Sequence, residues 1–148
     1  MKRRKFVVGN WKMHGLHEQL PEIGAIAKAA ADAPGVDTAL CVPATLIERA
    51  AAVAGDMPIG AQDVHANVKG PHTGCISAQM AREAGARLTI VGHSERRADQ
   101  NETSHDAWAK AVAAHEAGLD VILCCGETEA ERDAGLLDGG DIGFGEAL

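Results

Sequence analysis

The sequence predicts an α/β protein built on a parallel β-sheet, and three observations support this fold class. Short apolar runs recur along the 148 residues, segments of helical periodicity separate them, and polar residues follow three of the runs. The runs do not alternate polar and apolar residues, which is typical of strands buried on both faces of a parallel sheet. Regular alternation of such strands with helices indicates right-handed βαβ units.

Five strands are expected along the chain, each as a short apolar run. They lie at residues 5–8, 38–42, 58–61, 88–91 and 121–125. In three of the intervening segments, residues on one face step by three or four positions, as on a helix packed against a sheet. These residues are Leu16, Leu20, Ile23 and Ala27, then Leu46, Ala50 and Val53, then Trp108, Ala111, Val112 and His115.

Helix boundaries are marked by side chains that satisfy free backbone groups. Ser77 is the expected N-cap of the third helix, and Thr103 with Asp106 has the pattern of a capping box before the fourth. Gly85 and Gly118 stand where C-terminal glycines are expected. Pro43 opens the second helix, because proline suits the first helical turn.

Near the end of the sequence the pattern weakens. A fifth helical pattern starts at Thr128 with Glu131 three residues on, and the glycine-rich stretch from Leu136 to Leu148 predicts no helix. No linker or low-complexity tract interrupts the chain, so we expect one domain over residues 1–148 that loses its pattern at 136–148.

Composition excludes several classes of protein. The net charge of -7 argues against a nucleic-acid partner, since phosphate contacts need clustered lysine and arginine. No window approaches the roughly 20 apolar residues of a membrane span. The basic cluster at residues 2–5 precedes only Phe6, Val7 and Val8, too few for the apolar region of a signal peptide.

The four cysteines predict a reducing, cytoplasmic location. No C-x-x-C spacing occurs, and Cys41, Cys124 and Cys125 fall within apolar strand runs, where they are expected to be small core residues. Cys75 lies in a loop. The seven histidines include two close pairs, His14 with His17 and His65 with His72, but neither has the ligand spacing of a zinc site. We therefore expect no metal.

Polar residues at the strand ends are the candidate functional groups. Lys12, two residues past Asn10, suits a phosphate or carboxylate, although a solvated surface lysine is an equal alternative. His93 is suited to an acid, base or electrophile, against the alternative of a structural histidine. Ser94 and Glu95 behind it also fit the cap and first-turn acid of a short helix.

Two further segments are less specific. Gln62 after the third strand is a possible hydrogen-bond donor with no stronger signal. The polar, glycine-rich loop at residues 70–74 suggests either a flexible flap or a segment that docks on a partner.

Taken together, these segments resemble the triosephosphate isomerase family. The resemblance rests on Gly9-Asn10-Trp11-Lys12-Met13, Gly60-Ala61-Gln62, Thr73-Gly74 with Ile76-Ser77, the run Val91 to Arg97, and Cys124 with Gly126-Glu127. It covers residues 5 to 135 in the family's order and spacing. It implies a (β/α)8 barrel that interconverts dihydroxyacetone phosphate and glyceraldehyde 3-phosphate without a cofactor.

The resemblance also implies roles for individual residues. Lys12 corresponds to the ammonium that binds substrate, and Asn10 to the amide that holds Lys12 and substrate oxygens. His93 corresponds to the neutral electrophile that polarises the carbonyl; the family is the well-known example of a histidine kept neutral by a helix N-terminus. Glu95 resembles the carboxylate beside Lys12, and the supporting positions also include Ser94 and Cys124.

A partner subunit is implied as well. The loop at Thr73, Gly74 and Cys75 resembles the segment that inserts into a second subunit, so a homo-oligomer is expected. Cys75 stands where the family usually has an acidic residue, so we expect the docking contact to be altered.

The sequence departs from the family in its extent. A barrel of this class takes about 250 residues, and the residues here supply about five of eight strands. The family's glutamate base follows strand six, and Glu127 does not match it. We therefore expect an incomplete, truncated barrel with little activity of its own. The alternative is a non-catalytic half-barrel that self-associates or weakly binds phosphate compounds.

Overall fold

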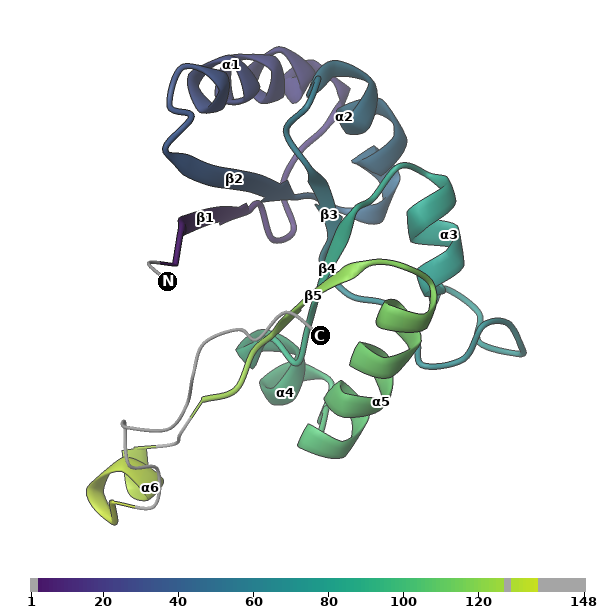
Figure 1. Cartoon of the computed structure of the whole chain (residues 1–148). Helices are drawn as coiled ribbons and strands as arrows, with labels where there is room; N and C mark the ends of the chain where they lie inside the picture. Colours follow the sequence, from purple (N-terminus) through teal and green to yellow (C-terminus); the bar gives the residue numbers. More distant parts are fainter. Residues whose placement is uncertain (1–2, 127–128, 136–148) are drawn as a thin grey trace.

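The fold is one curved parallel sheet with helices on its outer side. The computed structural model describes residues 3–126 and 129–135. Its strands pair in chain order and all in parallel. They are β1 (Lys5–Asn10), β2 (Val36–Cys41), β3 (Ile59–Ala61), β4 (Leu88–Val91) and β5 (Asp120–Leu123). The predicted five-strand parallel architecture is therefore confirmed, and the sheet curls as part of a barrel (Figure 1).

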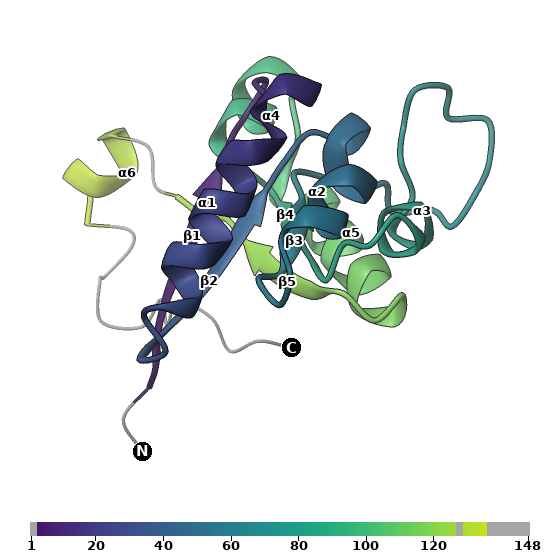
Figure 2. The same cartoon turned by 90° about the horizontal axis from the view of Figure 1, so that it is seen from above.

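Helices connect successive strands. They are η1 (His17–Gln19), α1 (Leu20–Ala31), η2 (Ala44–Leu46), α2 (Ile47–Val53), α3 (Ala78–Glu83), α4 (Ser94–Asp99), α5 (Ser104–Glu116) and α6 (Glu129–Asp133). The outer side of the sheet is covered by α1, α2, α3 and α5, whereas α6 lies apart from it (Figures 1 and 2). Three parts of the sequence discussed above lie outside the described residues: Thr128, where the fifth helical pattern is predicted to start, Glu127, and residues 136–148.

The predicted helix caps are present. The Ser77 hydroxyl accepts a hydrogen bond of 3.2 Å from the amide of Met80, and Thr103 with Asp106 forms a reciprocal capping box at α5. Gly85 and Gly118 follow α3 and α5 with φ values of 107° and 79°, a conformation that favours glycine. Pro43 immediately precedes η2, which leads into α2. Local sequence signals thus set these boundaries.

The main core lies between the sheet and the outer helices. It combines large aliphatic side chains from α1, α2 and the strands with a row of alanines from α3 and α5. Its largest fully buried members are Ile23, Leu46, Ile47, Ile59 and Leu119. Small residues let the helices approach the sheet closely, which explains the high alanine content.

The predicted buried face of α5 is partly wrong. Ala107, Ala111 and Ala114 are the residues buried against the sheet, whereas Trp108 is 51% exposed and Val112 is also exposed. A spacing of three and four positions is shared by the predicted row and by the row of buried alanines, so it does not distinguish them. Alanines occupy the face of α5 that packs against the sheet, and the larger side chains face outward. Leu16 is exposed as well, because it precedes η1 outside the helical face.

A smaller cluster lies on the inner side of the sheet. Its buried residues are Ala39, Cys41, Leu88 and Ile90, with Val8, Ile122 and Cys124 packed against them. Ile90 lies in this inner cluster, whereas Leu40 belongs to the outer core and Val7 is exposed. Side chains alternate along a strand, so Leu40 points opposite to its neighbours Ala39 and Cys41.

The cysteines differ in environment. Cys41 is buried, as expected, and burial raises the pKa of its thiol to about 12. Cys124 follows β5 and is only partly buried. Cys125 is exposed, contrary to expectation, because β5 already ends at Leu123. Cys75 is exposed in its loop. These environments make Cys41 a packing residue rather than a reactive thiol.

Within the described residues, β1 and β5 each pair on one side only, so the sheet does not close on itself (Figure 2). None of the helices in this part of the chain is long and apolar enough to cross a membrane.

Candidate active site

The carboxyl ends of β1, β3 and β4 surround a cavity of about 360 Å³. Its lining includes Asn10, Lys12, Gln62, His93 and Glu95, which come from the three segments singled out in the sequence. This end of a parallel sheet is where barrel proteins bind and transform ligands. A larger groove of about 670 Å³ lies beside α1 and the amino-terminal ends of β1 and β2. That end contributes mainly to stability in such folds.

Lys12 has a strained backbone at the edge of the cavity. Its φ of 53° is left-handed, which costs a residue other than glycine about 1–3 kcal/mol. The Lys12 amide donates a hydrogen bond of 2.9 Å to Asn10 Oδ1, and its carbonyl oxygen accepts one of 2.7 Å from Gln62 Nε2. Both backbone polar groups of Lys12 are therefore held by side chains.

The Lys12 ammonium reaches the next candidate residue. Its Nζ lies 2.7 Å from Glu95 Oε1, and this hydrogen bond together with the positive charge lowers the pKa of Glu95 below its usual value. Both side chains are about half exposed. Glu95 thus stays ionised at neutral pH and keeps the ammonium near the cavity.

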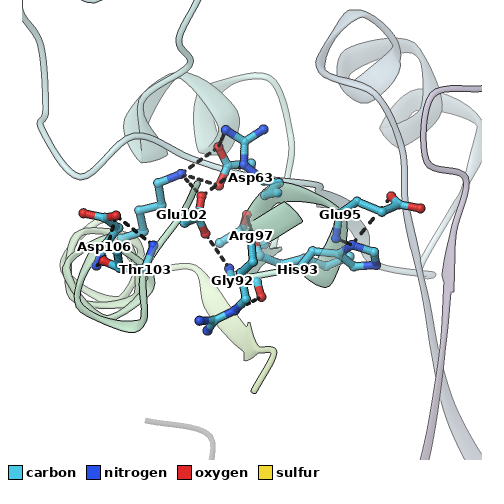
Figure 3. A network of polar contacts seen from close by, with 12 residues as sticks. Asp63, Gly92, His93, Glu95, Arg97, Glu102, Thr103 and Asp106 are labelled. Atoms are coloured by element: carbon cyan, nitrogen blue, oxygen red, sulfur yellow. Dashed lines mark hydrogen bonds and ion pairs between the residues drawn. The ribbon is translucent and has the colours of Figure 1, made fainter. Parts of the chain in front are cut away.

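His93 lies beside Glu95 and caps α4 (Figure 3). Its Nδ1 accepts a hydrogen bond of 3.2 Å from the Glu95 amide, whereas Glu95 Oε2 lies 3.6 Å away, too far for a hydrogen bond. Because Nδ1 is occupied as an acceptor, this contact leaves Nε2 as the ring nitrogen that can donate. Nε2–H is then available as a donor.

The two remaining supporting positions are placed differently. Ser94 is exposed as the first residue of α4; His93, one position earlier, is the N-cap that we had considered for Ser94. The Cys124 carbonyl oxygen accepts a hydrogen bond of 3.0 Å from Arg97, and its thiol packs with the inner cluster. Neither residue lines the cavity.

Sequence reasoning missed a group of four charged residues beside the cavity (Figure 3). Lys110 Nζ lies 2.9 Å from Asp63 and 2.6 Å from Glu102, and Arg96 contacts the same two carboxylates at 3.2 Å. The Glu102 side chain is only 4% exposed. These residues come from four separate segments, so no spacing in the sequence could have indicated them.

The two carboxylates of this group have opposite pKa shifts. Burial raises the pKa of Asp63, although Lys110 and Arg96 act against it. Burial also acts to raise the pKa of Glu102, but its hydrogen bonds with Lys110 and Arg96 and their charges lower it overall. Glu102 is therefore the firmly ionised partner.

Gly92, directly before His93, is held at both backbone groups. Its amide donates a hydrogen bond of 3.0 Å to Glu102 Oε1, and its carbonyl oxygen accepts one of 2.7 Å from Arg97 Nε. With φ of 71°, and with a Cβ that would lie 2.9 Å from Ala107, Arg97 and Cys124, the position requires glycine. The charged group thus fixes the backbone that carries His93.

The segment between β3 and α3 forms a projecting loop (Figure 2). The rings of His65 and His72 stack with centroids 4.0 Å apart, and Asn67 hydrogen-bonds to both. Gly74 and Cys75 line the cavity, whereas Thr73 is exposed. Among the described residues, no set of three histidine, cysteine or acidic side chains could hold a metal ion.

Fold and site together define the class of protein: parallel βα units with a site that combines lysine, histidine and carboxylate side chains at the carboxyl ends of the strands. A sequence model of the family described as triosephosphate isomerase matches residues 5–138, and the chain belongs to this family.

Individual relatives agree with this assignment. Triosephosphate isomerase of Ruegeria sp. (strain TM1040) is 54% identical over 133 residues, covering 89% of this chain and 53% of the relative. That of Afipia carboxidovorans is 53% identical over 137 residues, covering 90% and 55%. The crystal structure of triosephosphate isomerase from Bartonella henselae superposes with a TM-score of 0.84 at 43% identity, covering 91% of this chain and 56% of that one. The chain spans about half the length of these relatives.

Proposed function

We propose that Asn10, Lys12 and His93 form the substrate-binding and electrophilic part of a triosephosphate isomerase site, acting without a cofactor on dihydroxyacetone phosphate and glyceraldehyde 3-phosphate. The observation that carries this proposal is that Lys12 and His93 both contact Glu95 and line the same cavity. Membership of the family supports the same reaction.

The chemistry follows from the charges in the cavity. Isomerisation removes a proton from the carbon beside a carbonyl group, and negative charge then develops on the carbonyl oxygen. The neutral His93 Nε2–H can donate a hydrogen bond to that oxygen, which stabilises an enediolate more than the starting ketone or aldehyde. The Lys12 ammonium offsets the charge of the phosphate and of the enediolate. The Asn10 amide positions Lys12 through its backbone.

The base that removes the proton is not supplied by the acidic residues lining the cavity. Glu95 is paired with Lys12, and Asp63 is paired with Lys110 and Arg96. In the family the glutamate base follows strand six, whereas the described residues contain five strands. We therefore propose that these residues bind the substrate and stabilise the enediolate, but do not abstract the proton.

We also propose self-association through the projecting loop at Thr73, Gly74 and Cys75, as the family resemblance implies. The open edges of β1 and β5 support association as well. A cytoplasmic location is proposed from the four cysteines, all of which are free thiols.

The experiment is a calorimetric titration of the 148-residue chain with dihydroxyacetone phosphate. Replacing Lys12 with Met keeps much of the volume and removes the charge, so binding should be lost. The matched control is Lys28→Met, which removes an exposed lysine on α1 far from the cavity and should leave the affinity unchanged. Equal affinity of Lys12→Met and the unmodified protein would show that Lys12 does not bind the substrate.

A further inference from the structure

Lys12 lies between an anchored residue and an exposed one. The Trp11 amide before it donates a hydrogen bond of 3.0 Å to the Cys41 carbonyl oxygen, and the Trp11 side chain packs against the main core. Met13 after it is 93% exposed. With φ of 53° Lys12 adopts a conformation that L-residues disfavour, so contacts from elsewhere must stabilise it.

Gln62 supplies such a contact from the position directly after β3, fifty residues further along the chain. Its Nε2 donates a hydrogen bond of 2.7 Å to the Lys12 carbonyl oxygen and one of 3.2 Å to Asn10 Oδ1. Asn10 Oδ1 in turn accepts the bond of 2.9 Å from the Lys12 amide. The three residues form a closed ring of hydrogen bonds around the Lys12 backbone.

The ring requires a carboxamide at position 62. A single amide nitrogen carries two donor hydrogens, which the two acceptors in the ring both use. Glutamate would present only acceptors, and an apolar side chain would leave the Lys12 carbonyl oxygen without this partner. Gln62 is thus chemically matched to the place that it occupies.

The backbone conformation matters because the ammonium has little else to hold it. The Lys12 side chain is 53% exposed, and its ion pair with Glu95 is a surface pair of a kind that contributes little by itself. We propose that Gln62 is a positioning residue for Lys12, holding its backbone in the left-handed conformation that directs the ammonium toward Glu95 and the cavity. The effect of Gln62 on substrate binding rests on the proposed function. Its effect on the position of the Lys12 ammonium is independent of that function.

The experiment measures the Glu95 carboxyl group by NMR titration in the full 148-residue chain. In the unmodified protein the pKa of Glu95 lies below its usual value because Lys12 is close. Gln62→Met keeps the approximate size and removes the donors, so the pKa of Glu95 should rise toward that in Lys12→Met. Adding Gln62→Met to Lys12→Met should then change it no further. Gln79→Met, an exposed position on α3, is the matched control.

A purely structural role for Gln62 would lower the melting temperature and leave the pKa of Glu95 unchanged, and this result would overturn the inference. Gln62→Asn serves as a second variant if Gln62→Met does not fold, since it keeps a polar group but withdraws it by one methylene. In the unmodified protein, the Gln62 carboxamide protons should exchange slowly with solvent. Exchange as rapid as that of Gln79 would also overturn the inference.

Binding of dihydroxyacetone phosphate separates this inference from the proposed function. We expect Gln62→Met to lower the affinity of the otherwise unmodified chain. In the Lys12→Met variant, the same substitution should cause no further loss of affinity. If the unmodified chain binds no ligand but Gln62→Met still raises the pKa of Glu95, the positioning role stands and the proposed function fails. If the ligand binds normally and the pKa does not move, the positioning role alone is wrong.

Discussion

The Glu102 carboxylate accepts a hydrogen bond of 3.0 Å from the Gly92 amide, although the two residues lie on opposite sides of α4 in the sequence. Gly92 immediately precedes His93, so this contact connects a buried charged group to the backbone of the proposed electrophile. The other Glu102 oxygen contacts Lys110 and Arg96. The stability of this group and the position of His93 are therefore linked.

Replacing Glu102 with Ala should be strongly destabilising. It leaves the Gly92 amide without this acceptor and removes one of two carboxylates from Lys110. Removing one partner of a buried ion pair typically costs about 3–5 kcal/mol. Denaturant unfolding should show a loss of this size, whereas Glu83→Ala on the exposed side of α3 should change the free energy of unfolding little. Equal effects of the two substitutions would contradict the role of the buried pair.

Stability should fall on acidification through Glu102. A carboxylate whose pKa is lower in the folded state stabilises the fold above its unfolded pKa, and this contribution disappears as the pH drops through the folded value. For Glu102 the loss begins near pH 4.5 and continues below it. Glu102→Gln should flatten this acid branch in unfolding experiments across pH 3 to 7, a range that spans ordinary carboxyl titration.

Asp63 should change the pH dependence of stability in the direction opposite to Glu102. Because burial raises its pKa in the folded state, protonation of Asp63 relieves a cost as the pH falls. Asp63→Asn removes this compensation and should make the acid branch steeper than in the unmodified protein. Flattening by both substitutions would show that the assignment of the two carboxylates is wrong.

Isomerase activity of the 148-residue chain should be very low. General base catalysis alone contributes about 10²–10⁴-fold, and the acidic residues that line the cavity are already paired. A coupled enzyme assay measures the rate, with Lys12→Met as the control for contaminating host enzyme. A rate near that of a full-length relative, abolished by Lys12→Met, would contradict this prediction.

The 148-residue chain should associate or bind hydrophobic dyes. Val7 on β1 is 57% exposed and Leu123 on β5 is 43% exposed, beside strand edges that are unpaired among the described residues. Covering apolar surface is favourable by roughly 25 cal/mol per Å². Light scattering should show oligomers or aggregates, or else dye binding should reveal a loosely packed monomer.

The control places a charged side chain on the β1 edge, because lysine on an edge strand opposes pairing with another strand. Val7→Lys should reduce association. A monodisperse monomer of the unmodified chain with a sharp melt and no dye binding would contradict the expectation.

The features of the fold that could be predicted from the sequence depend on local interactions. The order of strands and helices, the caps at Ser77 and Thr103, and the glycines after α3 and α5 all depend on residues within a few positions of one another. The polar residues Asn10, Lys12 and His93 were predicted at strand ends because parallel strands bring their carboxyl ends to one edge.

Contacts between side chains that are distant in the sequence could be seen only in the folded chain. The apolar runs do not alternate, so nothing in them distinguished the outer face that holds Leu40 from the inner face that holds Cys41. Likewise Gln62 gains its significance from Lys12, and Glu102 from Gly92, through contacts set by the curvature of the sheet and the packing of its connections. Such contacts depend on the folded chain as a whole, and spacing in the sequence carries no record of them.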